Sequence, residues 1–535
     1  MIQATFNSRK GIVAKPLLLA LISLGLLACL GFLILQIRPD AKRFSSSQQT
    51  VRVYCASGIA KPVEQIIRKF NRDYGAHVEI VRTGGSGELA GQIKTEFKTN
   101  LRDGADLYIT ADDRLLTQGQ AEGVYAERFS LAEQKPVIAV ASSRKIEIRS
   151  VIELVQSDDL KFGVASERAA VGKIIRNIAK REGVLTDLES KKTTDAENVM
   201  TLAQALVAGS LDAAVIWDTT VAQINQANSS EDGPLLEISA FADPLDEFKS
   251  DIAIGVIARS KAPTDCLRFA RYLTAPETGK MDFTKLGFSF IEGDTWKEIP
   301  EIHLYCGSMF TPVLETAVRS FATREGVNIY PRWEGCGKLV ASMESIEDDE
   351  LFPDAYLACD ESFLEQVRDR FEKPTTVSHN QIVMAARVDL DTRIEHPRDL
   401  LNRDLRIGLC DPDQSALGRL TQTLLSNEPY QGLYDQLDDV AAVTVDVGPT
   451  LMSQLIAGGL DVAFVYRSNV MASAEFHQIQ IIEIANHGGR AIATQPWAIS
   501  KTTQHSDLME RLFDWINRAE MQKRFRDNGF EWIGK

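Results

Sequence analysis

The sequence lacks the short motifs that mark the commonest enzyme and metal-binding classes. It contains no CxxC pair and no GxSxG, HExxH, Walker A or Rossmann GxGxxG pattern. Its 7 histidines form no ligand-like pair, and its 7 cysteines, an odd number, fit neither a disulfide framework nor a zinc module. We therefore predict a protein that is not an enzyme, with no catalytic residue, no bound metal and no cofactor.

Clusters of positive charge are also scarce. The 535 residues carry a formal net charge of −15, and no basic block lies outside the N-terminus. Nucleic-acid binding needs clustered Lys and Arg, so we expect no nucleic-acid partner. A hydrophobic content of 44% with 25% charged residues is typical of a globular chain of several domains.

One apolar run is long enough to cross a bilayer. Residues 16–37 are almost entirely apolar and follow a short segment with three basic and no acidic residues. We predict a cytoplasmic N-terminus at 1–15, a signal anchor at 16–37 and a polar linker at 38–50. The bulk of the chain then lies in the periplasm, attached to the membrane by a single pass. Lipidation at Cys29, in a weak lipoprotein-like box, and ordinary cleavage remain the alternatives.

The segment from Val51 to Asp112 predicts two strands that each end at a hydroxyl-bearing turn before a helix. The first strand ends at Ala56-Ser57-Gly58, and the second ends at Gly84-Gly85-Ser86-Gly87. The first free N–H groups of a helix, together with a Ser hydroxyl, make a ready anion site. In open α/β sheets such sites lie at the carboxyl ends of the strands.

The same pattern returns about 250 residues later. Tyr54-Cys55-Ala56-Ser57 corresponds to Tyr305-Cys306-Gly307-Ser308, and Ser86-Gly87-Glu88-Leu89 corresponds to Cys336-Gly337-Lys338-Leu339. A repeat of this size is a tandem duplication and not a solenoid. We predict two α/β units, residues 51–298 and 299–535. Each has two lobes with mixed, mostly parallel sheets flanked by helices.

Each unit resembles the molybdate-binding periplasmic protein family, which has a type II solute-binding protein fold. The resemblance rests on three parts of the first unit: Ala56-Ser57, the turn with Leu89-Ala90-Gly91-Gln92-Ile93, and the segment Ala105–Asp112. It covers nearly all of the chain after residue 50, twice. It implies that a small dehydrated oxyanion is held between the lobes by neutral donors, without a cofactor.

The resemblance places the donors residue by residue. In the first unit it implies two Ser hydroxyls, two helix-start N–H groups and an aromatic position, which are Ser57, Ser86, Val171, Val199 and Trp217. The family has Tyr at the last position, and the indole N–H of Trp donates with a different geometry. A different oxyanion or a larger ligand therefore stays open for this unit.

The second unit departs further from the family pattern. Its corresponding positions are Ser308, Cys336, Leu417, Gly448 and Tyr466. A thiol is a weaker donor than a hydroxyl, so Cys336 and the nearby Glu334 should weaken oxyanion binding. We expect the first unit to hold the better oxyanion site, and the second to be degenerate or retuned.

Plainer explanations exist for several of these residues. Ser57, Ser86 and Ser308 sit where Ser is favoured as a helix cap, and Trp217 and Tyr466 end apolar strands where a buried aromatic is common. Three cysteines of the second unit fall near strand ends in one lobe. These are Cys306, Cys336 and Cys359. Three interpretations stay open for them: ordinary buried thiols, a disulfide between two of them, or a site for a thiophilic ligand.

The resemblance implies a membrane-anchored extracytoplasmic protein that binds a small oxyanion such as molybdate or tungstate. Its expected partner is an ABC-type permease that recognises the closed form. A membrane-tethered sensor or scaffold, with a different ligand or none, is the alternative. Nothing after the second repeat resembles a kinase or transporter, so either role needs a partner protein.

Overall fold

The structure is a computed structural model that describes residues 49–99, 104–228, 233–241, 248–402, 404–485 and 489–534. The predicted anchor at residues 16–37 and Cys29 lie outside these ranges. Among the residues that are described, no helix is long and apolar enough to cross a membrane. The predicted fold class is confirmed, with two successive α/β units that each have mixed sheets flanked by helices.

The first lobe of the first unit is a six-stranded sheet in the order β11-β4-β10-β3-β1-β2. Its strands are β1 (Val51–Ala56), β2 (Val78–Gly84), β3 (Leu107–Thr110), β4 (Tyr125–Gln134), β10 (Ser250–Ile257) and β11 (Ser289–Phe290). Its helices are η1 (Ser57–Ile59), α2 (Ala60–Tyr74), α3 (Ser86–Thr99), α4 (Arg114–Ala121), α10 (Pro263–Thr274) and α11 (Lys280–Thr284). Strands β1, β2 and β3 are parallel, and β4, β10 and β11 are antiparallel to their neighbours.

The second lobe of the first unit is a five-stranded sheet in the order β7-β6-β8-β5-β9. Its strands are β5 (Pro136–Ala141), β6 (Phe162–Ala165), β7 (Thr194–Ala196), β8 (Ala213–Trp217) and β9 (Leu236–Phe241). Its helices are α5 (Val151–Gln156), α6 (Ala170–Arg181), α7 (Leu185–Lys191), α8 (Val199–Val207) and α9 (Asp218–Ala227). Every residue of β5, β6 and β8 is buried, as expected for strands covered on both faces.

The second unit is built around one ten-stranded sheet. Its strands are β12 (Glu301–Gly307), β13 (Asn328–Glu334), β14 (Ala355–Leu357), β15 (Thr375–Arg387), β16 (Ile407–Cys410), β17 (Val443–Val445), β18 (Val462–Tyr466), β19 (Ile479–Glu483), β20 (Ile492–Ile499) and β21 (Glu531–Trp532). Its α-helices are α12 (Thr311–Glu325), α13 (Cys336–Glu344), α14 (Glu361–Leu364), α15 (Ala416–Ser426), α16 (Leu433–Asp438), α17 (Gly448–Ile456), α18 (Arg467–Met471), α19 (Ser506–Ile516) and α20 (Ala519–Asp527). Short 3₁₀ turns complete it: η3 (Ser308–Phe310), η4 (Asp349–Leu351), η5 (Glu365–Arg370), η6 (Pro397–Asn402) and η7 (Phe476–Gln478).

Apolar spacing explains the helices that the sequence predicted. In α2 the residues Val63, Ile66, Ile67 and Phe70 are all buried on one face, and the helix ends at Gly75 with a left-handed φ of 61°. For the stretch between Asp112 and Pro136 the sequence predicts a helix, but this is wrong for most of its length, because α4 is followed by the ten-residue strand β4. Buried and more exposed side chains alternate along much of β4, which is strand periodicity.

The crossover between lobes differs in the two units. In the first unit β4 ends at Gln134, and β5 starts in the other sheet at Pro136. Proline has no backbone N–H and a fixed φ, so it fits the start of a strand and not the middle of one. In the second unit β15 runs unbroken through 13 residues and pairs with strands of both lobes.

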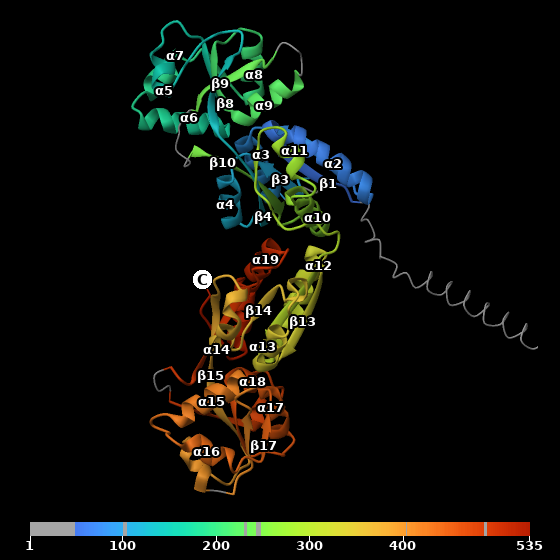
Figure 1. Cartoon of the computed structure of the whole chain (residues 1–535), viewed down its shortest axis with the longest axis vertical. Helices are drawn as coiled ribbons and strands as arrows, with labels where there is room; N and C mark the ends of the chain where they lie inside the picture. The colour runs from blue at the N-terminus through green and yellow to red at the C-terminus, as the bar shows by residue number, and fades with distance from the viewer. Residues whose placement is uncertain are drawn as a thin grey trace, which may run out of the picture.

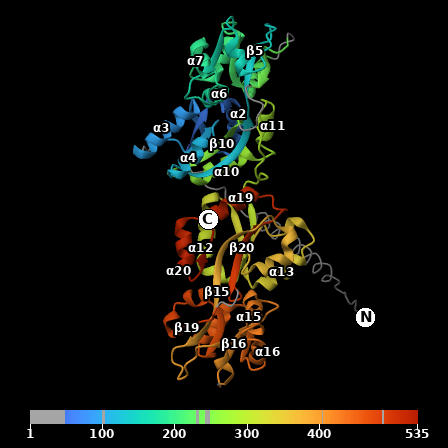
Figure 2. The ribbon, with the colours of Figure 1, turned by 90° about the vertical axis from the view of Figure 1, so that its left-hand side faces the viewer.

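The two first lobes meet at the middle of the molecule, and the two second lobes lie at its far ends (Figure 1). The view turned by 90° shows the same end-to-end order, with α10 next to α19 (Figure 2). Helix α10 of the first unit packs against α12 of the second. The two interlobe clefts are therefore separate, one in each half of the molecule.

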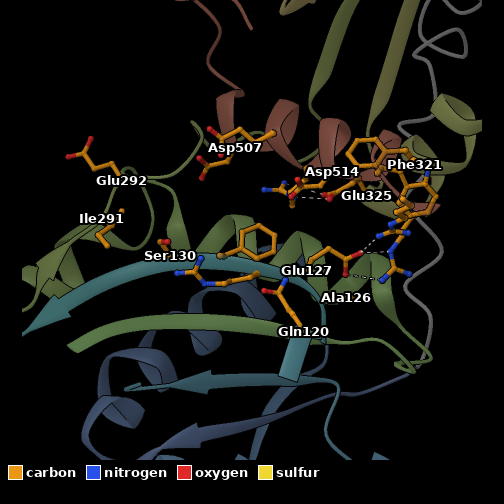
Figure 3. Close-up of a pocket in the computed structure, with 17 residues that line it drawn as sticks. Gln120, Ala126, Glu127, Ser130, Ile291, Glu292, Phe321, Glu325, Asp507 and Asp514 are labelled. Carbon is orange, nitrogen blue, oxygen red and sulfur yellow. Dashed lines mark hydrogen bonds and ion pairs between the residues drawn. The ribbon is translucent and has the colours of Figure 1, made fainter. Parts of the chain in front are cut away.

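Ion pairs fasten the units together around a cavity of about 350 Å³ (Figure 3). The buried carboxylate of Glu325 accepts from Arg271 Nη1 of the first unit at 2.6 Å and from Arg511 Nε at 2.8 Å. Glu127 of the first unit makes a two-pronged pair with Arg324, at 2.7 and 2.8 Å. Glu127 is 7% exposed and Glu325 is 1% exposed, so the carboxylates of this junction are paired and largely removed from bulk water.

A carboxylate of the first unit also caps a helix of the second. Asp294 Oδ1 accepts from the backbone N–H of Asp507 at 2.8 Å, and Oδ2 accepts from that of Leu508 at 3.0 Å. These are free N–H groups in the first turn of α19, so Asp294 acts as an N-cap supplied from the neighbouring unit. Burial raises the pKa of Asp294 to about 7.

Candidate functional site

A small cavity lies between the lobes of the first unit. Its volume is about 40 Å³, room for roughly three water-sized spheres. All five residues that the sequence indicated for this unit line it: Ser57, Ser86, Val171, Val199 and Trp217. The chain thus brings these residues together from both lobes, while their contacts with a ligand stay a prediction.

Helix starts surround this cavity. Ser86 is the first residue of α3, Val171 is the second residue of α6, and Val199 is the first residue of α8. Ser57 opens the 3₁₀ turn that leads into α2. The first N–H groups of a helix have no partner within the helix, and the helix dipole makes that end partly positive. The cavity therefore offers several backbone donors to an anion.

The hydroxyl of Ser86 is oriented by its surroundings. Ser86 Oγ accepts a hydrogen bond from the backbone N–H of Ala111 at 3.1 Å, which occupies one of its acceptor positions. The buried Tyr108 hydroxyl donates to the Ser86 carbonyl at 2.6 Å and holds the turn in place. With that acceptor position filled, the Ser86 hydroxyl proton is available for donation.

The residues that line the cavity include no Lys, Arg or His, and Glu197 is the one ionisable side chain among them. Glu197 is an exposed residue at the rim, ahead of α8. An anion in this cavity would be held by backbone N–H groups, hydroxyls and the Trp217 indole, all of them neutral. Such donors are strong when directed at a charged acceptor in a site without water.

Sequence reasoning missed two glutamines next to the cavity. Gln134, the last residue of β4, lines the cavity with a buried side chain whose Nε2 has no hydrogen-bond partner. Gln223 of α9 donates from Nε2 to the Gly58 carbonyl at 2.8 Å and so links the two lobes. The sequence did contain a signal for Gln134. The second repeat has Asn380 at the corresponding position, so both repeats carry an amide side chain there.

The corresponding residues of the second unit also lie at helix starts. Cys336 and Gly448 are the first residues of α13 and α17, and Leu417 is the second residue of α15. Ser308 opens η3 and is partly exposed. Tyr466 ends β18 and is 3% exposed, and its hydroxyl has no hydrogen-bond partner. This arrangement repeats that of the first unit.

The lobes of the second unit approach each other more closely. Gly337 N–H donates to the Gln414 carbonyl across the cleft at 3.0 Å, and Lys338 forms an ion pair with Asp446. A Cβ atom on Gly335 would lie 3.0 Å from the Asp446 carbonyl oxygen. The corresponding separation in the first unit, from Gly85 to the Glu197 carbonyl, is 3.9 Å. The second cleft is therefore narrower at this turn.

The thiols of the second unit are close together but unpaired. All cysteines among the described residues are free, so the disulfide alternative is not present in this structure. No described cluster of three or more His, Cys, Asp or Glu side chains is arranged to hold a metal ion. Cys336 Sγ accepts from the Cys359 backbone N–H at 3.0 Å, which copies the contact between Ser86 and Ala111.

The chain is similar to known binding proteins. The family model described as "Bacterial extracellular solute-binding protein" matches residues 51–289 and again 302–531. A putative binding protein of Haemophilus influenzae is 24% identical over 246 residues, which span 46% of this chain and 93% of that protein.

Solved structures match one unit at a time. The periplasmic molybdate-binding protein of Azotobacter vinelandii is 15% identical with a TM-score of 0.38, over 45% of this chain and 100% of that one. Iron-bound HitA from Pseudomonas aeruginosa is 19% identical with a TM-score of 0.39, over 45% and 86%. The sulfate-binding protein SubI of Mycobacterium tuberculosis is 14% identical with a TM-score of 0.37, over 44% and 87%.

Proposed function

The chain belongs to the bacterial extracellular solute-binding protein family, and from that membership we propose that its first unit binds a small oxyanion of the molybdate, tungstate or sulfate type. Closure of the two lobes encloses the ligand, and the closed form is presented to an ABC-type permease. The apolar residues 16–37 would hold the protein at the outer face of the cytoplasmic membrane.

The observation that carries this proposal is the cavity in which two serines and three helix starts converge without a cationic side chain. Helix N-termini favour anions through their free N–H groups and their dipoles. A cation would find the exposed Glu197 at the rim as its single ionised partner here. The donor set therefore supports an anionic ligand.

The size of the cavity supports a compact ligand. Room for roughly three water-sized spheres fits an oxyanion of a few heavy atoms, with little rearrangement of the walls. A sugar phosphate is several times larger and would force the lobes apart. Trp217 is one of the residues that line this cavity.

A second candidate function applies to the second unit. Its unbroken strand β15 and its cross-cleft contacts favour a unit that stays closed, which suits a scaffold or sensor more than a carrier. In this alternative the second unit supports the first and offers a surface to a partner protein, with no ligand of its own.

Calorimetric titration of the purified full-length chain with molybdate, tungstate, sulfate and phosphate tests the proposal. We expect saturable binding of at least one oxyanion, weakened about tenfold or more by Ser57→Ala, since a hydrogen bond to a charged group is lost. Ser308→Ala should have little effect on that binding. Ser210→Ala changes an exposed serine that bonds only to the Ala205 carbonyl and serves as the matched control.

Two outcomes would contradict this assignment. Absence of heat and of any thermal shift with all four oxyanions would refute the oxyanion ligand. Loss of binding in Ser308→Ala but not in Ser57→Ala would move the site to the second unit.

A further inference from the structure

Two buried amide side chains occupy the same place in the two units. Strand β5 pairs Pro136 with Trp217, and strand β15 pairs Ile382 with Tyr466. Gln134 and Asn380 each lie two residues before the residue that pairs with this cleft aromatic. They are 2% and 1% exposed. Both therefore stand at the crossover between lobes, beside the aromatic residue of their own cleft.

The oxygen of each amide is held by the segment that follows that aromatic residue. Gln134 Oε1 accepts from the Thr219 hydroxyl at 2.9 Å, and Asn380 Oδ1 accepts from the Ser468 backbone N–H at 3.4 Å. Thr219 and Ser468 each come two residues after Trp217 and Tyr466. Because a backbone N–H can only donate, the Asn380 oxygen must face it, and the Asn380 NH₂ group must point elsewhere.

The nitrogen of each amide is without a partner. Gln134 Nε2 and Asn380 Nδ2 are both buried and make no hydrogen bond in the part of the chain that the structure describes. A buried polar group that is left unsatisfied costs about 1–3 kcal/mol, so native structures rarely keep one without a reason. Here the arrangement occurs twice in one chain, with different amide residues. A bound ligand would supply the missing acceptor.

We propose that Gln134 and Asn380 are ligand-binding residues, each donating from its side-chain NH₂ to an oxygen of the oxyanion bound in its own unit. This inference rests on the proposed function and adds a residue type that the serine and helix-start donors do not provide. Gln134 already lines the cavity of the first unit. Since its oxygen faces the Thr219 hydroxyl, the amide directs its NH₂ group to the ligand and favours an unprotonated ligand oxygen.

The first experiment removes the donor from the first unit. Gln134→Leu keeps the approximate size of the side chain, and we expect it to weaken molybdate or sulfate binding by the full-length chain about tenfold or more in calorimetry. Thr219→Val breaks the same internal hydrogen bond from the other side but keeps the amide. It should weaken binding by a few-fold at most, which separates a ligand contact from a loss of local structure.

A second variant gives a readout that a structural role would not change. Gln134→Glu replaces the NH₂ donor by a carboxylate, which repels the anion when ionised and donates again when protonated. Its affinity for sulfate should therefore rise between about pH 8 and about pH 5. The wild-type affinity for sulfate, which stays ionised over this range, should change little.

The second unit is tested in a chain whose first site is weakened twice, by Ser57→Ala together with Gln134→Leu. The affinity of any remaining oxyanion binding should fall about tenfold or more when Asn380→Leu is added. Binding of a single equivalent that Ser57→Ala abolishes would overturn the inference for Asn380. Equal affinities of wild type and Gln134→Leu would overturn it for Gln134 while leaving the proposed function intact. No binding of either oxyanion to the wild type would refute both.

Discussion

The two units of this chain share one architecture but differ at the crossover between their lobes. The first unit has two separate sheets, its lobes have separate hydrophobic cores, and Pro136 begins the second sheet. The second unit has one sheet and one continuous core, joined by the unbroken strand β15. A single strand break thus separates a unit of two sheets from a unit whose two lobes share one sheet.

The donors at the two clefts differ in the same direction. Ser86 in the first unit is replaced by Cys336 in the second, although each accepts from the backbone N–H that follows the third strand. The second cleft also has direct lobe-to-lobe contacts through Gly337 and Lys338. The crossover between the lobes and the donor set therefore both differ between the units, which is expected if the second unit binds its anion less tightly than the first.

The largest effect should come from separating the units at their junction. Glu325→Gln leaves Arg271 and Arg511 without their buried counter-charge, and we expect a loss of about 3–5 kcal/mol in the free energy of unfolding. Glu315→Gln on the same helix removes an exposed pair with Arg319 and should cost less than about 0.5 kcal/mol. Urea unfolding of both variants measures the difference.

Equal stability of these two variants would show that the junction contributes little. The two units would then be independent in their stability and not stabilised by the contact between them. A transition that splits into two steps only in Glu325→Gln would show instead that the junction makes the units unfold together.

The next effect concerns strand β15, which joins the two lobes of the second unit. Ile382 lies within β15, and its backbone N–H donates to the Ala491 carbonyl at 2.7 Å. Because proline lacks this N–H, Ile382→Pro should lower the free energy of unfolding by about 3 kcal/mol or more, as measured by thermal unfolding. Pro136→Ala is the matched change in the first unit and should cost less than about 1 kcal/mol. Tolerance of Ile382→Pro would mean that β15 does not need to be continuous.

The stability of the protein should depend on pH through Asp294, the residue of the first unit that caps α19. Burial raises the pKa of Asp294 to about 7, above its unfolded value of about 3.9, so the folded protein binds the additional proton. Stability should therefore fall as the pH rises from about 4 to about 7, by roughly 3 kcal/mol. Thermal unfolding at about pH 5 and about pH 8 measures this.

Asp294→Asn removes the titration and keeps an acceptor for α19, so its stability should depend less on pH. Burial also raises the pKa of Asp507 and Asp514, so a part of the slope should remain. Glu292→Gln, at a pair with Lys280 whose side chains are half exposed, is the control. An unchanged slope in Asp294→Asn would exclude Asp294 as the titrating group.

The smallest expected effect tests the donor difference directly. Cys336→Ser replaces a weak donor by a hydroxyl at the start of α13, and we expect oxyanion binding by the second unit to strengthen about tenfold. Ser86→Cys is the reverse change in the first unit and should weaken binding there by a similar factor. Calorimetry of both in the full-length chain measures the effect. If neither variant alters affinity, the difference between hydroxyl and thiol does not explain the difference between the units.

The cysteine at this position is not an ordinary buried thiol. Burial works to raise the pKa of Cys336, but the hydrogen bonding of its thiol with Cys359 acts in the opposite direction, and the net pKa lies below its usual value. The sulfur accepts from the Cys359 backbone N–H, and a thiol is a weaker donor than the Ser86 hydroxyl. This gives a physical reason why an anion should bind less well in the second unit than in the first.

Much of the candidate site could be predicted because it depends on local sequence. Ser57, Ser86 and Val199 each follow a short strand and open a helix or helical turn, so their position at the carboxyl edge of a sheet follows from the chain order. Trp217 ends a strand that is apolar throughout, which placed it at the same edge. The structure brings all of them to one cavity.

The remaining residues depend on contacts that no local pattern encodes. Gln134 sits at the end of β4, which the apolar pattern did not reveal, and its orientation is set by Thr219 from the other lobe. From the sequence alone, Glu325 is expected to be a solvent-exposed residue at the end of an amphipathic helix. Only the packing of α12 against α10 and α19 buries it between two arginines.

The junction between the units has a consequence for the history of the gene. After the duplication, each copy supplied groups that the other now neutralises: Arg271 and Asp294 from the first copy, and Glu325 and the start of α19 from the second. Deletion of either half would expose the packed surface of the junction to water, and deletion of the first half would leave α19 without its cap. Fusion was therefore difficult to reverse, and each copy would have been retained whatever the affinity of its own ligand site.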